Sequence, residues 1–447
     1  MSKLNHAKLI IHRDTEKIGG SVVELISNNG SRIIIDAGVP LLEDDGSMLD
    51  FDKYKSKSVK ELIDLGIIPY VNGLYKNINS KNKSAIDGIL ISHAHRDHYG
   101  LIQYIKDDLK YYLTEATHKL IDITTLFSDS KIEIDNYQYI NSGQPFTIKD
   151  FKITPYFMNH SGFDSQAFLI EADGKNLVYT GDFRGHGRKN TLEYFFRNLP
   201  EKIDGLIMEG SNIGNENKTE KPEASLEAEI EKVLAEPGLV LFTASGQNVD
   251  RIISFYRAAR KTERIFLIDF YTANILDIIK DHAEIPYPSS KFSDVKAYYP
   301  EFLTEKIFNM NQEELAYKFS DYKMEKEEIV AHRNKLLMLV RNSTVHDLNK
   351  ISDLEKDIFK KASFIYSRWP EYLEKGKFKN LQNFIDENNM KFHKIYTSGH
   401  ADIKTSAKVV DKLKPAKLFP IHTLNPEEYN QFNADVKKLE NSEVYEL

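Results

Sequence analysis

Six consecutive residues form the densest group of metal-ligating side chains in this sequence. His93-Ala94-His95-Arg96-Asp97-His98 supplies three imidazoles and a carboxylate, directly after the apolar run Gly88 to Ser92, which is typical of a strand. Imidazole and carboxylate are ligands that suit Zn²⁺ or Mn²⁺, and a strand end lets such side chains converge on one point. The pattern predicts a metal site. The sequence has no cysteine, so any metal must be held by histidine and carboxylate.

His93, His95, Asp97 and His98 match the HxHxDH signature of the metallo-β-lactamase superfamily. This resemblance implies an α/β fold, an αββα sandwich with two divalent metal ions at one edge. It also implies further ligands in chain order. His160 and Asp182, each after a predicted strand, match those positions. Asp36, in Ile-Ile-Ile-Asp-Ala-Gly, matches an acid that contacts the metal ligands without binding the metal itself.

Three later motifs resemble those of the β-CASP nucleases, a branch of this superfamily. His400 lies in Ser-Gly-His-Ala-Asp, His422 in Pro-Ile-His-Thr, and Glu209 in Met-Glu-Gly-Ser. The branch includes RNase J and the nuclease subunit that cleaves mRNA precursors, but also DNA-processing members. RNase J-like relatives usually have a further C-terminal domain, and archaeal relatives of the cleavage factor carry RNA-binding modules in front. Neither is expected in this sequence, so we expect RNA to bind in the cleft between the two domains.

The resemblance also assigns a role to each ligand. It implies one metal on His93, His95 and His160, another on Asp97, His98 and His422, and Asp182 bridging the two. Zn²⁺ is favoured by the histidine-rich ligands, and Mn²⁺ is compatible with them. His400, oriented by Glu209, would protonate the departing 3′ oxygen during hydroxide attack supported by both metals, which leaves a 5′-phosphate. A Glu partner favours the charged imidazole, which suits a general acid. The catalytic residues predicted in this way are His400, Glu209 and Asp97.

The elements that position these residues divide into two domains. We expect residues 1–213 to form the first part of the metallo-β-lactamase domain, 214–392 an inserted α/β β-CASP domain, and 393–447 the C-terminal part of the first domain. Strands and helices alternate from Val240 to His282, which predicts a parallel sheet in the insertion. Residues Leu303 to Lys361 have helical spacing and predict capping helices, and a strand is predicted over Lys394 to Thr397.

Weaker signals concern the substrate. Ser245, Gln247, Ser367 and Arg368 follow predicted strands of the insertion, where they could hold phosphate, although ordinary helix capping explains the same pattern. For Trp369 and Tyr372, core packing is favoured over base stacking. The run Arg184 to Lys189 predicts a basic rim beside Asp182.

Composition limits the partners only loosely. A net charge of -7 argues against broad attraction to a polyanion, although a basic groove or bound cations reverse the field locally. No apolar run is long enough for a membrane span, so we expect a cytoplasmic protein without a membrane partner. RNA is the expected substrate, cleaved internally or from the 5′ end. DNA is the main alternative, followed by a small-molecule metallo-hydrolase and a scaffold with an inactive site. The sequence leaves the oligomeric state open.

Overall fold

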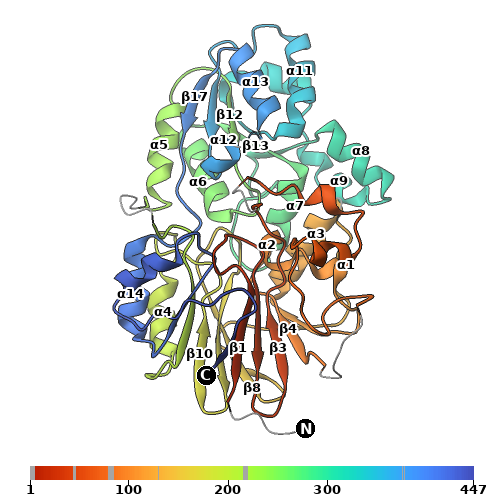
Figure 1. Cartoon of the computed structure of the whole chain (residues 1–447). Coiled ribbons are helices and arrows are strands. Elements are labelled where there is room, and N and C mark those ends of the chain that lie inside the picture. The colour runs from red at the N-terminus through yellow and green to blue at the C-terminus, as the bar shows by residue number, and fades with distance from the viewer. Residues whose placement is uncertain are drawn as a thin grey trace.

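Two β-sheets packed face to face form the lower domain of the computed structural model (Figure 1), which describes residues 6–43, 47–78, 85–128, 130–214, 220–374, 376 and 378–447. The seven-stranded sheet has the order β19-β1-β2-β3-β4-β5-β6, and the six-stranded sheet the order β18-β11-β10-β9-β8-β7. The first contains β1 (Lys8–Arg13), β2 (Val22–Ile26), β3 (Arg32–Ile35), β4 (Gly88–Leu90), β5 (Tyr111–Leu113), β6 (Tyr137–Tyr139) and β19 (Val444–Glu446). The second contains β7 (Phe146–Ile148), β8 (Phe151–Phe157), β9 (Gln166–Ala172), β10 (Lys175–Tyr179), β11 (Gly205–Glu209) and β18 (Leu418–Ile421).

Helices cover the outer face of each sheet, so that the domain has four layers. One apolar core fills the space between the sheets, with Leu25, Ile35 and Phe168 among its fully buried members. Helices lie on opposite sides of the double sheet in Figure 1. They are α1 (Val59–Asp64), α2 (Arg96–Tyr99) and α3 (Glu115–Phe127) on one side, and α4 (Thr191–Asn198) and α14 (Ile403–Leu413) on the other. The expected αββα sandwich is confirmed.

The second domain is inserted between two neighbouring strands of the six-stranded sheet. β11 and β18 pair in parallel, with Glu209 opposite Ile421, although the whole insertion separates them in sequence. The inserted sheet has six strands, all parallel, in the order β14-β13-β15-β12-β16-β17. They are β12 (Val240–Thr243), β13 (Ile265–Asp269), β14 (Val295–Tyr298), β15 (Leu336–Leu339), β16 (Ser363–Tyr366) and β17 (Lys391–Lys394).

Helices cover both faces of the inserted sheet, and its central strands are therefore buried on both sides, as parallel strands usually are. One face packs against α5 (Ser225–Leu234), α6 (Val249–Lys261) and α7 (Phe270–Ile279), and the other against α10 (Lys326–Ala331), α11 (Val345–Leu354) and α13 (Lys379–Glu387). The remaining helices are α8 (Glu301–Asn309), α9 (Glu314–Tyr317) and α12 (Pro370–Glu374).

Two expectations for the insertion need correction. The capping helices expected from Leu303 to Lys361 are present as α8 to α11, but the stretch also contains β15. A short apolar run buried on both faces has no periodicity that separates strand from helix. The strand predicted over Lys394–Thr397 lies instead at Lys391–Lys394, and all four of its residues pair with β16. By hydrogen bonding, this strand belongs to the inserted sheet, so the predicted boundary at residue 392 falls within it. Residues 215–219, at the predicted start of the insertion, lie outside the described residues.

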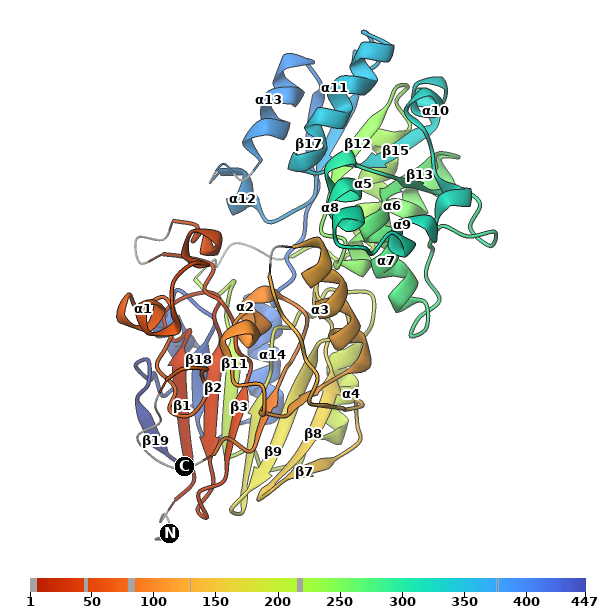
Figure 2. The same cartoon turned by 90° about the vertical axis from the view of Figure 1, so that its right-hand side faces the viewer.

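The two domains meet along α3 of the lower domain and α7 of the insertion, which lie side by side (Figure 2). Phe127 packs edge-on against Phe270, with ring centroids 5.3 Å apart. The Gln247 amide donates a 2.7 Å hydrogen bond to Thr124 Oγ1. This contact fixes one side of the cleft between the domains. Across the described ranges, no helix combines the length and apolar character needed to span a bilayer.

Candidate metal centre and cleft

Four strand ends bring the predicted ligands to one edge of the sandwich, facing the insertion. His93, His95, Asp97 and His98 follow β4, and the other three each follow a further strand: His160 after β8, Asp182 after β10 and His422 after β18. Their ligand atoms form two groups that share Asp182. The first group is His93, His95, His160 and Asp182, and the second is Asp97, His98, Asp182 and His422, each with its atoms within 4.8 Å of one another.

The first group places three imidazole nitrogens around one point. Nδ1 of His95 lies 3.1 Å from Nε2 of both His93 and His160. Asp182 Oδ2 lies 3.7 Å from His93 Nε2 and 3.6 Å from His160 Nε2. These separations match ligands about 2 Å from a common Zn²⁺ or similar ion.

The second group contains unpartnered buried nitrogens. Nε2 of His98 and of His422 is buried and has no hydrogen-bond partner among the described residues. Both point to carboxylates: Asp182 Oδ2 lies 3.2 Å from His98 Nε2, and Asp97 Oδ2 lies 3.8 Å from His422 Nε2. A buried polar atom without a partner is costly, and a shared divalent cation would satisfy both nitrogens. The residues present therefore fit a pair of metal ions.

Carboxylates behind two histidines fix the direction in which their rings face. Asp36, the acid predicted to support the site, lies 2.8 Å from His98 Nδ1 and accepts hydrogen bonds from the Ser92 amide and the Tyr179 hydroxyl, both at 2.7 Å. Asp14 Oδ2 lies 2.7 Å from Nδ1 of His422. Each carboxylate directs the opposite nitrogen, Nε2, toward the metal position.

Asp14 is a site residue that the sequence analysis missed. It follows β1 directly and adopts a left-handed conformation, with φ of 90°, just as Asp36 follows β3 with φ of 60°. An acid immediately after a predicted strand was the available signal. Its partner, His422, lies at the opposite end of the chain and follows a strand of the other sheet, so only the packing of the two sheets brings the two together.

The histidines of the two ligand groups differ in the direction in which their surroundings shift the pKa. Burial lowers the pKa of His93 and His160 well below the usual value and that of His95 to about 4, so all three rings stay neutral and able to bind metal. Burial also opposes charge on His422, but Asp14 and Asp182 outweigh it and raise its pKa to about 10. A metal at the second position therefore competes with a proton.

His400 lies beside the metal ligands with its ring held by Glu209. Its Nδ1 is 3.2 Å from Glu209 Oε1 and 3.0 Å from Ser211 Oγ. Burial disfavours the charged ring, but the Glu209 and Asp182 carboxylates outweigh it and raise the pKa of His400 above its usual value. The Asp402 carboxylate, two residues on, caps α14 by accepting the Thr405 amide at 2.9 Å, which anchors this loop.

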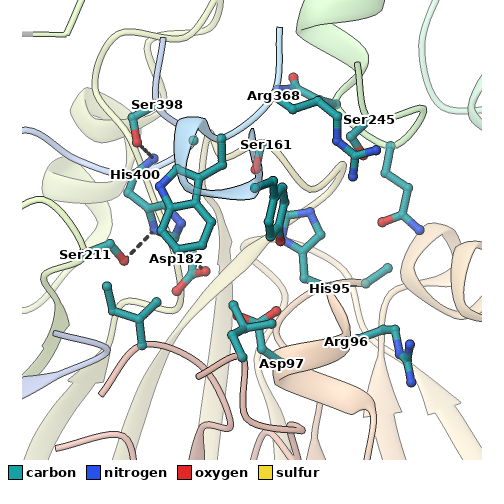
Figure 3. A pocket seen from close by; sticks show the side chains of 18 of the residues that line it. His95, Arg96, Asp97, Ser161, Asp182, Ser211, Ser245, Arg368, Ser398 and His400 are labelled. Carbon is teal, nitrogen blue, oxygen red and sulfur yellow. Dashed lines mark hydrogen bonds and ion pairs between the residues drawn. The ribbon is translucent and has the colours of Figure 1, made fainter. Parts of the chain in front are cut away.

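A cleft of about 520 Å³ lies between the domains, above the ligands. His95, Asp97, Asp182, His400 and His422 line it from below. In Figure 3, Arg368 and Ser245 of the insertion face them from above. All four predicted substrate contacts line the cleft, namely Ser245, Gln247, Ser367 and Arg368.

Only some of those four offer free groups to a substrate. The Ser367 hydroxyl accepts from Arg251 at 2.7 Å and donates to the Ile395 carbonyl at 2.5 Å, and its amide donates to Thr243. The expectation that Ser367 holds phosphate is therefore wrong, because its polar groups are used within the protein. Gln247 is engaged with Thr124 across the domain contact. Arg368 and Ser245 are the better placed candidates.

The predicted basic rim is a buried ion cluster instead. Arg184 is 1% exposed and pairs with Glu223 at 3.1 Å and with Asp250 at 2.7 Å, both in the insertion. Arg251 bonds the same Glu223 at 2.7 Å. Arg188 pairs with Glu227. Because acids of the insertion meet arginines of the lower domain, Arg184 and Arg188 join the domains rather than facing a substrate. His186 bonds the Ser398 carbonyl at 2.7 Å, within the lower domain.

Comparison with known proteins agrees with this geometry. The Beta-lactamase superfamily domain matches residues 71–211. Ribonuclease J of Helicobacter pylori is 24% identical over 295 residues, covering 64% of this chain but only 40% of that protein. An RNase J-like protein of Methanocaldococcus jannaschii is 24% identical over 441 residues, covering 93% of this chain and 92% of that protein.

A solved structure of similar fold covers almost the whole chain. It is a protein of unknown function from Enterococcus faecalis V583, with a TM-score of 0.77 and 18% identity over 99% of this chain and all of that one. The αββα sandwich, the order of the ligands, the inserted domain and these relatives agree. Residues 71–211 match the Beta-lactamase superfamily domain, and the relatives, at modest identity, support the β-CASP nuclease family.

Proposed function

We propose that this protein is a metal-dependent phosphodiesterase that cleaves RNA and leaves a 5′-phosphate. The observation that carries the proposal is the pair of ligand groups sharing Asp182, placed beneath a cleft that also contains His400 and its partner Glu209. The two most informative relatives bear the names ribonuclease J and RNase J-like protein, which supports RNA as the substrate class. Zn²⁺ is the metal that the histidine-rich ligands favour.

In the proposed reaction, a phosphodiester lies in the cleft between the metal ligands and Arg368. Two divalent ions, when bound, would neutralise the phosphate and lower the pKa of the attacking water. Glu209 holds Nδ1 of His400, which leaves Nε2 to donate a proton. The proton passes to the 3′ oxygen as its bond to phosphorus breaks, so the products carry a 3′-hydroxyl and a 5′-phosphate.

The alternative functions fit the structure less well. A small-molecule hydrolase needs no second cleft wall, whereas residues of the insertion line one side of this cleft. An inactive scaffold would not need to keep seven ligands and the two carboxylates behind them. DNA remains the alternative substrate class that the experiment must separate from RNA.

The test incubates matched end-labelled single-stranded RNA and DNA with Zn²⁺-loaded or Mn²⁺-loaded protein and resolves the products at single-nucleotide resolution. A circular RNA is included because only internal cleavage can open it. We expect RNA cleavage with 5′-phosphate ends and none with the Asp97→Ala variant, which lacks a ligand of the second group. Cleavage of DNA alone would change the substrate class, and cleavage of neither would refute the nuclease proposal.

A further inference from the structure

Trp369 is the only tryptophan in the chain, and it lies in the cleft rather than in a core. It follows β16 by three residues, at the edge of the inserted sheet that faces the metal ligands. Trp369 is half-buried, and it belongs to none of the five hydrophobic clusters found in the described ranges. The favoured expectation of core packing is therefore wrong for Trp369, although Tyr372 does pack against the core of the insertion.

The surroundings of Trp369 hold its backbone but leave room on its ring. Its carbonyl accepts hydrogen bonds from the Tyr366 hydroxyl at 2.8 Å and from the Tyr372 amide at 3.1 Å, and Pro370 follows it. The ring meets Tyr372 edge to face, at 5.2 Å and 81°. Such a contact covers at most one face of the indole. The loop after β16 therefore presents an aromatic surface to the cleft.

A cation without an acidic partner lies next to this surface. Arg368 lines the same cleft, and its guanidinium rests over the rings of Tyr372 and Phe378, 5.6 Å and 5.2 Å from their centroids. In the part of the chain that the structure describes, it makes no hydrogen bond or ion pair. Its neighbour Arg341, by contrast, is paired with Asp269. A guanidinium without a carboxylate partner thus lies next to an aromatic ring. Proteins that bind single-stranded nucleic acids use this combination to contact a phosphate and to stack on a base.

We propose that Trp369 stacks on an unpaired base of the strand in this cleft, while Arg368 contacts a phosphate of the same strand. This inference rests on the proposed function, because it assumes a nucleic-acid substrate. It makes Trp369 a specificity-determining residue, since a base held in a duplex cannot offer its face to the indole.

The single tryptophan allows a direct test that needs no catalysis. Fluorescence of the Asp97→Ala protein, excited where tryptophan alone absorbs, is followed during titration with single-stranded oligoribonucleotide, duplex RNA of the same sequence, and an abasic strand of equal length. We expect quenching by the unpaired strand only. Equal quenching by the abasic strand would overturn the proposal, because phosphates alone would then account for the change.

Affinity for a labelled oligoribonucleotide, measured by anisotropy, tests the same contact in variants. Trp369→Ala should bind about 5- to 150-fold more weakly. Trp369→Phe, which keeps an aromatic face, should lose less. Tyr317→Ala removes an exposed aromatic of the insertion outside the cleft and serves as the matched control. If Trp369→Ala binds as tightly as this control while the intact protein cleaves RNA, stacking is refuted and the nuclease proposal stands. If the intact protein neither binds nor cleaves nucleic acid, both fail.

Discussion

At the scale of single residues, each side chain at the site has a partner that determines what it can do. Asp36 and Asp14 direct His98 and His422 toward the second metal position, and Glu209 turns His400 toward the cleft. None of these three carboxylates belongs to the HxHxDH cluster. The chemistry of the cluster therefore depends on acids that lie elsewhere in the sequence.

The role of His400 can be separated from metal binding by the choice of leaving group. His400→Ala should slow RNA cleavage about 10²- to 10⁴-fold, yet slow hydrolysis of bis(p-nitrophenyl) phosphate less than about tenfold, because nitrophenolate departs without a proton. Steady-state kinetics on both substrates measure the difference. His332→Ala, which changes an exposed histidine of the insertion, is the control. Equal losses on the two substrates would show that His400 acts through the metal site instead.

The buried carboxylate behind His422 gives a second prediction. Asp14→Asn keeps the size of the side chain but removes the charge that holds Nδ1 of His422, so metal affinity should fall about 10- to 100-fold. Competition with a chromophoric chelator measures this affinity. Asp150→Asn, which alters a carboxylate bound only to Ser27, Asn29 and Ser31 among the described side chains, should leave it unchanged. Unchanged affinity in Asp14→Asn would remove Asp14 from the site.

At the scale of elements, a buried ion cluster connects the loops that surround the cleft. Arg184 lies two residues after Asp182 and bonds Asn159, the neighbour of His160, at 2.7 Å. Arg251, near the start of α6, bonds Ser367 and the Thr397 carbonyl. Glu223 joins these two arginines. The loops that carry His160 and Asp182, the loop that carries His400, and the residues of the insertion that line the cleft are thus held together by these contacts.

Glu223→Gln should destabilise the protein by about 3 kcal/mol, because two buried arginines lose their shared charge. Burial alone would raise the pKa of Glu223, but Arg251 and Arg184 outweigh it and lower the pKa from 4.5 to about 2. The carboxylate therefore stabilises the fold above about pH 4.5, and this stabilisation is lost as the pH falls toward 2. Urea unfolding between pH 7 and pH 3 measures both effects.

The variant should show a weaker acid dependence than the unaltered protein over that range. Glu231→Gln is the matched control, since it alters a partly exposed pair with Lys261 on α5 and α6, and such pairs contribute at most about 1 kcal/mol. An equal loss in both variants would mean that the cluster does not hold the domains together.

At the scale of the whole molecule, the metal centre lies where the two domains meet, so occupancy and stability should be linked. The buried Nε2 atoms of His98 and His422 face carboxylates but have no hydrogen-bond partner within the described residues, and bound metal would satisfy them. Removal of metal by a chelator should therefore lower the midpoint of thermal unfolding. Zn²⁺ at a thousandfold excess over its Kd should raise the free energy of unfolding again by about 4 kcal/mol. Differential scanning fluorimetry with and without EDTA checks this. A midpoint that chelation and Zn²⁺ leave unmoved would contradict the predicted site.

The sequence alone determined the fold class and the types of side chain gathered at the candidate site. Metal-ligating side chains at short spacing, such as His93 to His98, are a local pattern in the sequence. Further motifs, in a fixed order after predicted strands, indicate the αββα sandwich that brings these side chains together. The alternation after Val240 likewise predicted a parallel sheet, because strand and helix periodicity are local properties.

Only the tertiary structure decided which distant groups act together. The packing of the two sheets brings His422 to Asp14, and the pairing of β11 with β18 places the insertion over the metal ligands. No local pattern encodes those contacts. For the same reason, Arg184 became an interdomain ion pair and Trp369 a cleft residue, since burial depends on what the rest of the chain places around each side chain.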